Sequence, residues 1–212
     1  MVTRTFVKIC GITRPEDAHA AVRAGADAVG FVFAPSPRRV SASSAGTITD
    51  ALHPSILKIG VFVDESLDNV LSAIDRAGLD GVQLQGSESS GFVSELRSRK
   101  RALRIFKVVK GASREELALA EGLDVDALFI DPKRTDDPIA PVEPIPLATL
   151  RDLPMRFVVA GGLNAANVGP LVSQIRPWGV DVSGGVEEEP GRKDHLKIRA
   201  FVRAVREADA HP

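Results

Sequence analysis

Cys10 and Asp131 are the two side chains whose types and positions best suit acid–base chemistry in this sequence. Cys10 is the single cysteine of the 212 residues and ends an apolar run, residues 5–10, while Asp131 ends the run 127–131. A thiolate can remove a proton and a carboxylic acid can donate one, so the pair could move protons on a molecule held between them. A lone cysteine can also be a small buried apolar residue, and an aspartate after a strand can cap a helix or face solvent.

Two glycine-bearing segments predict an anion site. Gly161-Gly162 follows the apolar run 156–160, and Ser183-Gly184-Gly185 follows the run 180–182. Glycine lets backbone N–H groups approach an anion closely, and a helix capped by Asn164 would add the positive end of its dipole. Either segment alone is equally well explained as a tight turn. The two together favour phosphate binding.

Three polar side chains are further candidates for binding a substrate. Arg38 and Arg39 lie in a proline-bracketed loop, where either guanidinium could hold a carboxylate through two parallel hydrogen bonds. Arginines in such a loop are often only solvated charge. Gln85 comes directly after another short apolar run, 81–84, and its amide can both donate and accept hydrogen bonds.

Eight short apolar runs must position these residues, and each is followed by a segment with helical periodicity or capping signals. Thr13 with Glu16, for example, is expected to form a capping box for the first helix. Eight strand–helix units at a spacing of about 25 residues predict one (β/α)8 barrel covering residues 1–212. The C-terminal ends of its strands would then bring the candidate residues to one rim. The predicted strands are 5–10, 28–33, 56–63, 81–84, 103–109, 127–131, 156–160 and 180–182.

Strand alternation predicts a buried ion pair beneath that rim. Lys8 lies two residues before Cys10, and Asp181 lies two residues before Ser183, so each should point into the barrel one layer below. The first and eighth strands are neighbours in a closed barrel, and either charge buried alone would be costly. We therefore predict that Lys8 pairs with Asp181, the alternative being that one of them faces the helices or solvent.

Composition excludes several classes of function. The formal net charge is −1 with both signs interspersed, which argues against nucleic-acid binding. The chain shows neither a signal-peptide pattern nor an apolar run of membrane-spanning length, so we expect a soluble cytoplasmic protein. One cysteine and four histidines without ligand spacing predict no metal site, and no cofactor is expected.

Ordered motifs along nearly the whole chain resemble the phosphoribosylanthranilate isomerase family of tryptophan biosynthesis. They include 8–13 (KICGIT), 16–18, 25–27, 30–33, 36–38, 60–63, 82–84, 160–164, 167–168, 180–183, 185–187, 190–191 and 193–194. The resemblance implies a cofactor-free Amadori rearrangement of N-(5-phosphoribosyl)anthranilate to 1-(2-carboxyphenylamino)-1-deoxyribulose 5-phosphate. It further implies a small phosphorylated substrate and a monomer or homodimer.

The same resemblance implies roles for individual residues. Cys10 corresponds to the general base at ribose C2, Asp131 to the general acid at the furanose oxygen, and Arg39 to the partner of the anthranilate carboxylate. The glycine segments, Gly161, Gly162, Ser183, Gly184 and Gly185, correspond to the phosphate clamp. Two positions and one segment depart from the family. Gln85 stands where a histidine is usual, Gly184 replaces a serine, and residues 132–147 are rich in proline where the family has glycine.

Two other functions follow from these departures. The chain could be an aldose–ketose isomerase for another aminated phosphoribosyl compound, or a catalytically silent barrel that binds a phosphorylated metabolite or acts as a partner subunit. Cys10 and Asp131 argue for catalysis, whereas the altered segment 132–147 favours the alternatives.

Overall fold

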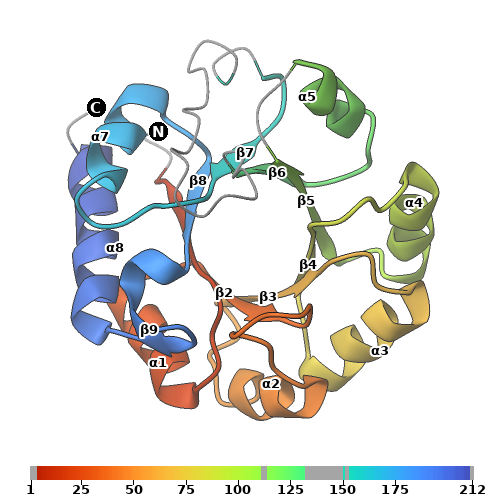
Figure 1. The fold of residues 1–212 in the computed structure, drawn as a ribbon, viewed down its shortest axis with the longest axis horizontal. Helices are drawn as coiled ribbons and strands as arrows, with labels where there is room; N and C mark the ends of the chain where they lie inside the picture. The colour runs from red at the N-terminus through yellow and green to blue at the C-terminus, as the bar shows by residue number, and fades with distance from the viewer. Residues whose placement is uncertain (1–3, 111–113, 132–149, 151–152, 211–212) are drawn as a thin grey trace.

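Eight parallel strands pair in sequence order and close into a barrel in the computed structural model, which describes residues 4–110, 114–131, 150 and 153–210 (Figure 1). The first strand pairs with both the second and the eighth, so the sheet has no free edge. All eight predicted strands are confirmed to within one or two residues. They are β1 Phe6–Ile9, β2 Ala28–Val32, β3 Leu57–Phe62, β4 Gly81–Leu84, β5 Arg104–Lys110, β6 Ala127–Asp131, β7 Phe157–Val159 and β8 Gly179–Val182.

Helices surround the barrel and cover the outer face of its strands (Figure 1). Those described are α1 Pro15–Ala24, α2 Ala42–Thr49, α3 Leu67–Ala77, α4 Ser90–Arg99, α5 Arg114–Glu121, α7 Val168–Ile175 and α8 His195–Ala210. After β8 come a short 3-10 helix, η1 Gly184–Val186, and a hairpin of β9 Glu187–Glu189 and β10 Arg192–Lys193. The sequence analysis did not predict this hairpin.

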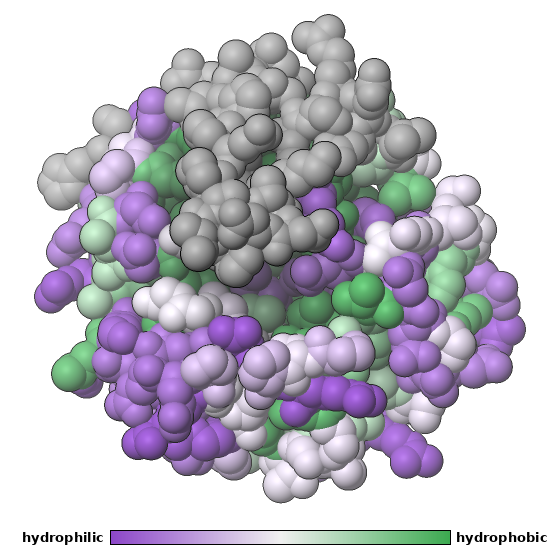
Figure 2. Space-filling view, in the orientation of Figure 1, coloured by the Kyte–Doolittle hydropathy of each residue, from purple (hydrophilic) through white to green (hydrophobic). Residues whose placement is uncertain are grey.

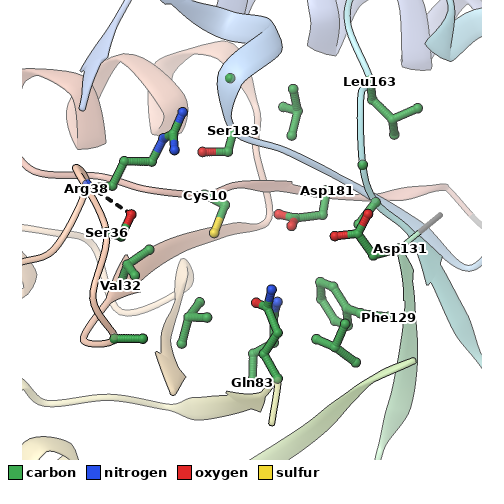
Figure 3. Close-up of a pocket in the computed structure, with 18 of the residues that line it drawn as sticks. Cys10, Val32, Ser36, Arg38, Gln83, Phe129, Asp131, Leu163, Asp181 and Ser183 are labelled. Atoms are coloured by element: carbon green, nitrogen blue, oxygen red, sulfur yellow. Dashed lines mark hydrogen bonds between the residues drawn. The ribbon is translucent and has the colours of Figure 1, made fainter. Parts of the chain in front are cut away.

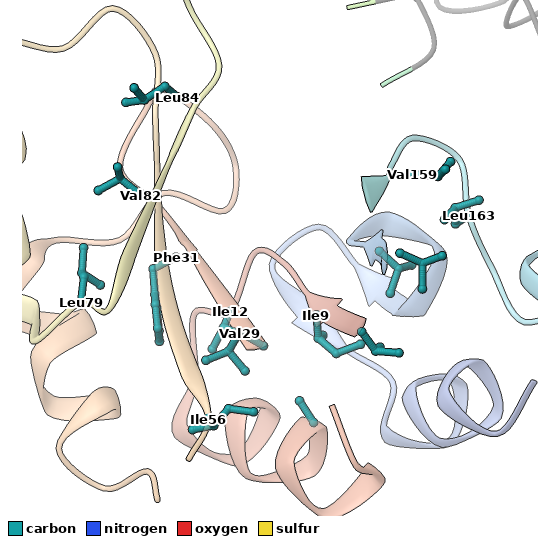
Figure 4. Close-up of a cluster of buried hydrophobic side chains, with 14 of the residues drawn as sticks. Ile9, Ile12, Val29, Phe31, Ile56, Leu79, Val82, Leu84, Val159 and Leu163 are labelled. Atoms are coloured by element: carbon teal, nitrogen blue, oxygen red, sulfur yellow. The ribbon is translucent and has the colours of Figure 1, made fainter. Parts of the chain in front are cut away.

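The strands bury apolar side chains on both faces, which explains their nearly continuous apolar sequences. One large cluster lies between the strands and the helices, and Figure 4 shows part of it, including Ile9, Val29 and Ile56. A smaller cluster fills the barrel interior, where Phe6, Phe106 and Phe129 are its largest members. On the viewed face, the surface over α1 and the β9–β10 hairpin is mainly hydrophilic (Figure 2).

Two predicted helix starts differ from the structure. The side chain of Thr13 does not cap α1; its hydroxyl donates to the Gly191 carbonyl at 2.5 Å, so it ties this turn to the hairpin after β8. Helix α7 begins at Val168 and not directly after Asn164, whose side chain accepts hydrogen bonds from Ala166 N and Asn167 N. Thr13 thus bonds to a residue distant in sequence, whereas Asn164 bonds within its own loop, and neither side chain caps the helix as expected. No helix among the described residues is long and apolar enough to span a membrane.

The predicted ion pair between β1 and β8 is confirmed. Lys8 and Asp181 are register partners, and Lys8 Nζ donates to Asp181 Oδ1 at 2.9 Å. The Lys8 side chain is fully buried and that of Asp181 is 10% exposed. The ammonium also lies 5.3 Å from the centre of the Phe129 ring. The barrel therefore contains a cation that is compensated by one carboxylate and an aromatic face.

We expect Asp181→Ala to lower the free energy of unfolding by about 3–5 kcal/mol, because it leaves the Lys8 charge buried without its partner. Chemical denaturation of the parent and variant measures this difference. Asp75→Ala serves as the control, since Asp75 pairs with Lys100 on the surface and its side chain is 64% exposed. That exposed pair should contribute at most about 1 kcal/mol. An Asp181 variant as stable as the Asp75 variant would contradict the buried pair.

Candidate active site

A pocket of about 640 Å³ opens at the C-terminal ends of the strands, the rim on which barrels of this kind carry their chemistry. Its volume is in the range of sites for small molecules. Eight of the nine predicted site residues line it together. They are Cys10, Gln85, Asp131, Gly161, Gly162, Ser183, Gly184 and Gly185.

Cys10 follows β1 and is held by its backbone, whose N–H donates to the Val182 carbonyl of β8 at 2.8 Å. The residue is 8% exposed and contacts the pocket. Gly30, on the neighbouring strand β2, leaves the space that the thiol occupies. A Cβ at Gly30 would lie 2.8 Å from Cys10 Sγ and 2.9 Å from Lys8 Cε, so any larger residue would displace both side chains.

The thiol belongs to a cluster with the buried ion pair. Burial raises the pKa of Cys10, and the negative charge of Asp181 raises it too, while the positive charge of Lys8 lowers it without reversing the net shift. Burial alone would lower the pKa of Lys8, but Asp181 and Cys10 outweigh that effect and raise it. Lys8 therefore stays charged directly beneath the thiol, and Cys10 holds its proton more tightly than an exposed cysteine does.

Asp131 ends β6 and contributes to the same pocket. Figure 3 shows Cys10, Asp131 and Asp181 around one open space, with the ring of Phe129 beside Asp131. The two candidate acid–base groups thus come from β1 and from β6 and reach a shared volume, as the sequence predicted. The segment 132–147 that follows Asp131 lies outside the described residues.

Only one of the two candidate arginines lines the pocket. Arg38 lines the pocket, whereas Arg39 is exposed and is not part of the lining. Arg39 forms a β-bridge with Val32, whereas Arg38 lies in the turn just before it and contacts the pocket. Gly11 leaves the space that the Arg38 side chain occupies. With φ of 74°, Gly11 has a conformation that favours glycine, and a Cβ there would lie 2.6 Å from Arg38 Cδ.

Glu187 connects Arg38 to the hairpin after β8. Its carboxylate accepts from Arg38 Nε at 2.8 Å and from a terminal Arg38 nitrogen at 2.6 Å, and it accepts from Lys193 Nζ at 2.8 Å. Lys193 Nζ also donates to the Ser183 carbonyl at 3.2 Å. Burial alone would raise the pKa of Glu187, but the hydrogen bonds from Arg38 and Lys193 outweigh it and lower the pKa to about 2.

Sequence reasoning gave neither Glu187 nor Lys193 a role in the site. Both belong to motifs that carried the family resemblance, but a charged residue in a loop gives no local signal of burial. The structure buries both, with side-chain exposures of 5% and 0%. Burial of Lys193 lowers its pKa.

The glycine segments after β7 and β8 meet at one side of the pocket. A Cβ at Gly185 would lie 1.8 Å from the Leu163 carbonyl oxygen, so the two loops touch through backbone atoms. Gly161 and Gly162 have φ of 78° and 66°, a region in which other residues are strained. The first turn of η1 starts at Gly184 beside them. This geometry suits an anion bound by backbone N–H groups, although α7 begins farther away than the sequence predicted.

Within the described part of the chain, no group of three or more His, Cys, Asp or Glu side chains is placed to hold a metal ion. The pocket contains a thiol, a carboxyl group, an inward arginine and two glycine loops whose backbone suits an anion. Together with the closed barrel, these features define a (β/α)8-barrel enzyme of acid–base chemistry on a phosphorylated small molecule.

Comparisons with known proteins identify the family. Residues 7–204 match the family described as N-(5'-phosphoribosyl)anthranilate (PRA) isomerase, and the chain belongs to this family. The N-(5'-phosphoribosyl)anthranilate isomerase of Dechloromonas aromatica is 41% identical over 211 residues, covering 97% of this chain and 98% of the relative. The enzyme of the same name from a Geobacter species is 42% identical over 201 residues, covering 93% and 96%.

Solved structures of the same family have the same fold. The phosphoribosyl anthranilate isomerase of Thermotoga maritima superimposes with a TM-score of 0.86 at 34% identity, covering 96% of this chain and 99% of that one. A second family structure, determined in complex with reduced 1-(o-carboxyphenylamino)-1-deoxyribulose 5-phosphate, has a TM-score of 0.83 at 35% identity with the same coverage.

The low pKa of Glu187 predicts how the stability of the protein depends on acid. A carboxyl whose pKa is lowered by folding stabilises the protein above its unfolded pKa, and this contribution is lost as the pH falls toward the folded value. Between pH 6 and pH 3, we expect the parent to lose about 2 kcal/mol more unfolding free energy than Glu187→Gln. Denaturant titrations at the two pH values measure the loss.

Glu188→Gln is the matched control, because Glu188 is the exposed neighbour on the same hairpin, with 48% of its side chain accessible. That variant should lose as much stability in acid as the parent. Equal losses for the parent and Glu187→Gln would show that Arg38 and Lys193 do not lower the pKa of Glu187.

Proposed function

We propose that this chain converts N-(5'-phosphoribosyl)anthranilate to 1-(2-carboxyphenylamino)-1-deoxyribulose 5-phosphate, as a step of tryptophan synthesis. The chain is an aldose–ketose isomerase by family, and the observation that carries its activity is the meeting of Cys10 and Asp131 in one pocket. A catalytically silent barrel would have no need for a thiol and a carboxyl group that face a common space.

The two anionic ends of the substrate fit two different parts of the pocket. The 5-phosphate is bound by the backbone of the loops containing Gly161, Gly162 and Ser183–Gly185, next to the first turn of η1. The anthranilate carboxylate is bound by Arg38, which takes the role that the sequence analysis gave to Arg39. Glu187 occupies one edge of the Arg38 guanidinium, which leaves its other N–H groups for the substrate.

Asp131 begins the reaction by donating a proton to the furanose ring oxygen as the bond from C1 to that oxygen breaks. The product of this step is an open-chain iminium ion, whose positive nitrogen makes the hydrogen on C2 acidic. Cys10, as the thiolate, removes the C2 proton, and the electron pair forms the C1–C2 double bond of an enolamine. Addition of a proton at C1 and loss of the enol proton give the ketone, so the atoms of substrate and product balance.

The buried ion pair supports the base in this scheme. Lys8 is charged and favours the thiolate of Cys10, whereas burial and Asp181 oppose it. The developing positive charge on the substrate nitrogen would further favour loss of the thiol proton. A group with a raised pKa is also a stronger base once it is ionised, which suits removal of a proton from carbon.

Gln85 lies in the pocket wall, half-buried, where its amide can contact the substrate without changing charge. We assign it a binding role. The protein is proposed to act in the cytoplasm as a monomer or homodimer; one of the similar structures is described as monomers generated from the dimeric enzyme of Thermotoga maritima.

Turnover of freshly prepared N-(5'-phosphoribosyl)anthranilate, followed by the loss of its anthranilate fluorescence, tests the proposal. Cys10→Ala and Asp131→Asn should each lower kcat by about 10²- to 10⁴-fold, the usual contribution of a positioned acid or base. Asp75→Asn, an exposed substitution outside the pocket, should leave kcat unchanged. A parent without turnover would refute the proposed activity, and near-normal rates in both pocket variants would refute the roles of these residues.

A further inference from the structure

Gln83 carries the one buried side-chain polar atom without a hydrogen-bond partner in the described residues, its amide oxygen Oε1. The residue lies on β4, between its register partners Val61 and Phe106, and is 5% exposed. A buried polar atom without a partner destabilises a folded protein, so each one in a native protein calls for an explanation, and a catalytic or ligand-binding function is one such explanation. The position of Gln83 indicates which function this is.

Its side chain points into the barrel and lines the pocket together with Cys10, Asp131 and Asp181. Figure 3 shows Gln83 across the open space from these residues. The buried charges of the barrel interior already have partners, since Lys8 pairs with Asp181. The amide is thus a neutral polar group left over at the floor of the pocket, beneath the rim to which the phosphate loops and Arg38 belong.

We propose that Gln83 binds a hydroxyl group of the ribosyl chain of the substrate. This inference rests on the proposed function, because a ligand held by phosphate at one end and carboxylate at the other places its sugar carbons over the barrel centre. A hydroxyl both donates and accepts, so it satisfies the amide whichever of its two polar atoms faces the ligand. A charged ligand group is a poorer match for an uncharged amide in a buried position.

The binding role and a structural role predict opposite effects on stability. Gln83→Met keeps the length of the side chain and removes the hydrogen-bonding group. If the Gln83 amide only binds the ligand, Gln83→Met should melt at the same temperature as the parent or higher, because a polar atom without a hydrogen-bond partner has been removed. If the amide stabilises the folded protein, Gln83→Met should melt at a lower temperature than the parent.

Calorimetric titration with two phosphate esters tests the hydroxyl directly. Ribitol 5-phosphate carries hydroxyls along a five-carbon chain, and n-pentyl phosphate has the same chain length without them. We expect the parent to prefer ribitol 5-phosphate over n-pentyl phosphate, and Gln83→Met to reduce this preference by about five- to tenfold, as for the loss of one satisfied hydrogen bond. Gln174→Met is the control, since Gln174 is exposed on α7 outside the pocket.

The outcomes separate this inference from the proposed function. An unchanged preference in Gln83→Met, or a lowered melting temperature with the preference intact, overturns the role of Gln83 even if the parent turns over its substrate. A preference lost in Gln83→Met but kept in Gln174→Met supports the hydroxyl site, even if the parent fails to isomerise N-(5'-phosphoribosyl)anthranilate.

Discussion

The pairing of β1 with β8 is the constraint on which the remainder of the site depends. It closes the barrel, and its register sets Lys8 opposite Asp181 and Ile9 opposite Val182. A shift of one residue would turn Lys8 toward the apolar layer beneath the helices and separate the two charges. Because an unpaired charge in either layer is costly, the ion pair favours the one register that also places Cys10 at the rim.

Two buried ion pairs, Lys8 with Asp181 and Lys193 with Glu187, have different roles at the pocket end of the barrel. Lys8 and Asp181 lie beneath the thiol and influence its protonation. In the second cluster, Glu187 accepts a hydrogen bond from Arg38, and Lys193 donates one to the Ser183 carbonyl. Ser183 connects the clusters, since it follows Asp181 by two residues and accepts a hydrogen bond from Lys193. Catalysis and ligand binding therefore share the same short stretch of chain at the end of β8.

The barrel could be predicted because it leaves a regular signal in the sequence. Each strand is a short apolar run. Strand alternation and the closed topology sufficed to place Lys8 beside Asp181 and to bring Cys10 and Asp131 to the same pocket. The failures came from loops, where side-chain direction depends on contacts that are distant in sequence. Arg38 and Arg39 are adjacent, yet Arg38 lies in a turn and lines the pocket, while Arg39 bridges to Val32 and is exposed. Thr13 similarly contacts Gly191, which lies 178 residues away.

Alkylation of the unmodified chain tests most directly whether Cys10 is the base in a ligand-binding site. The sequence has one cysteine, so mass spectrometry after treatment with iodoacetamide reports on Cys10 alone. Our account predicts that the singly alkylated protein has lost turnover of N-(5'-phosphoribosyl)anthranilate, and that ribitol 5-phosphate slows the alkylation. Fully alkylated, folded protein that turns over substrate at the parental rate would contradict it.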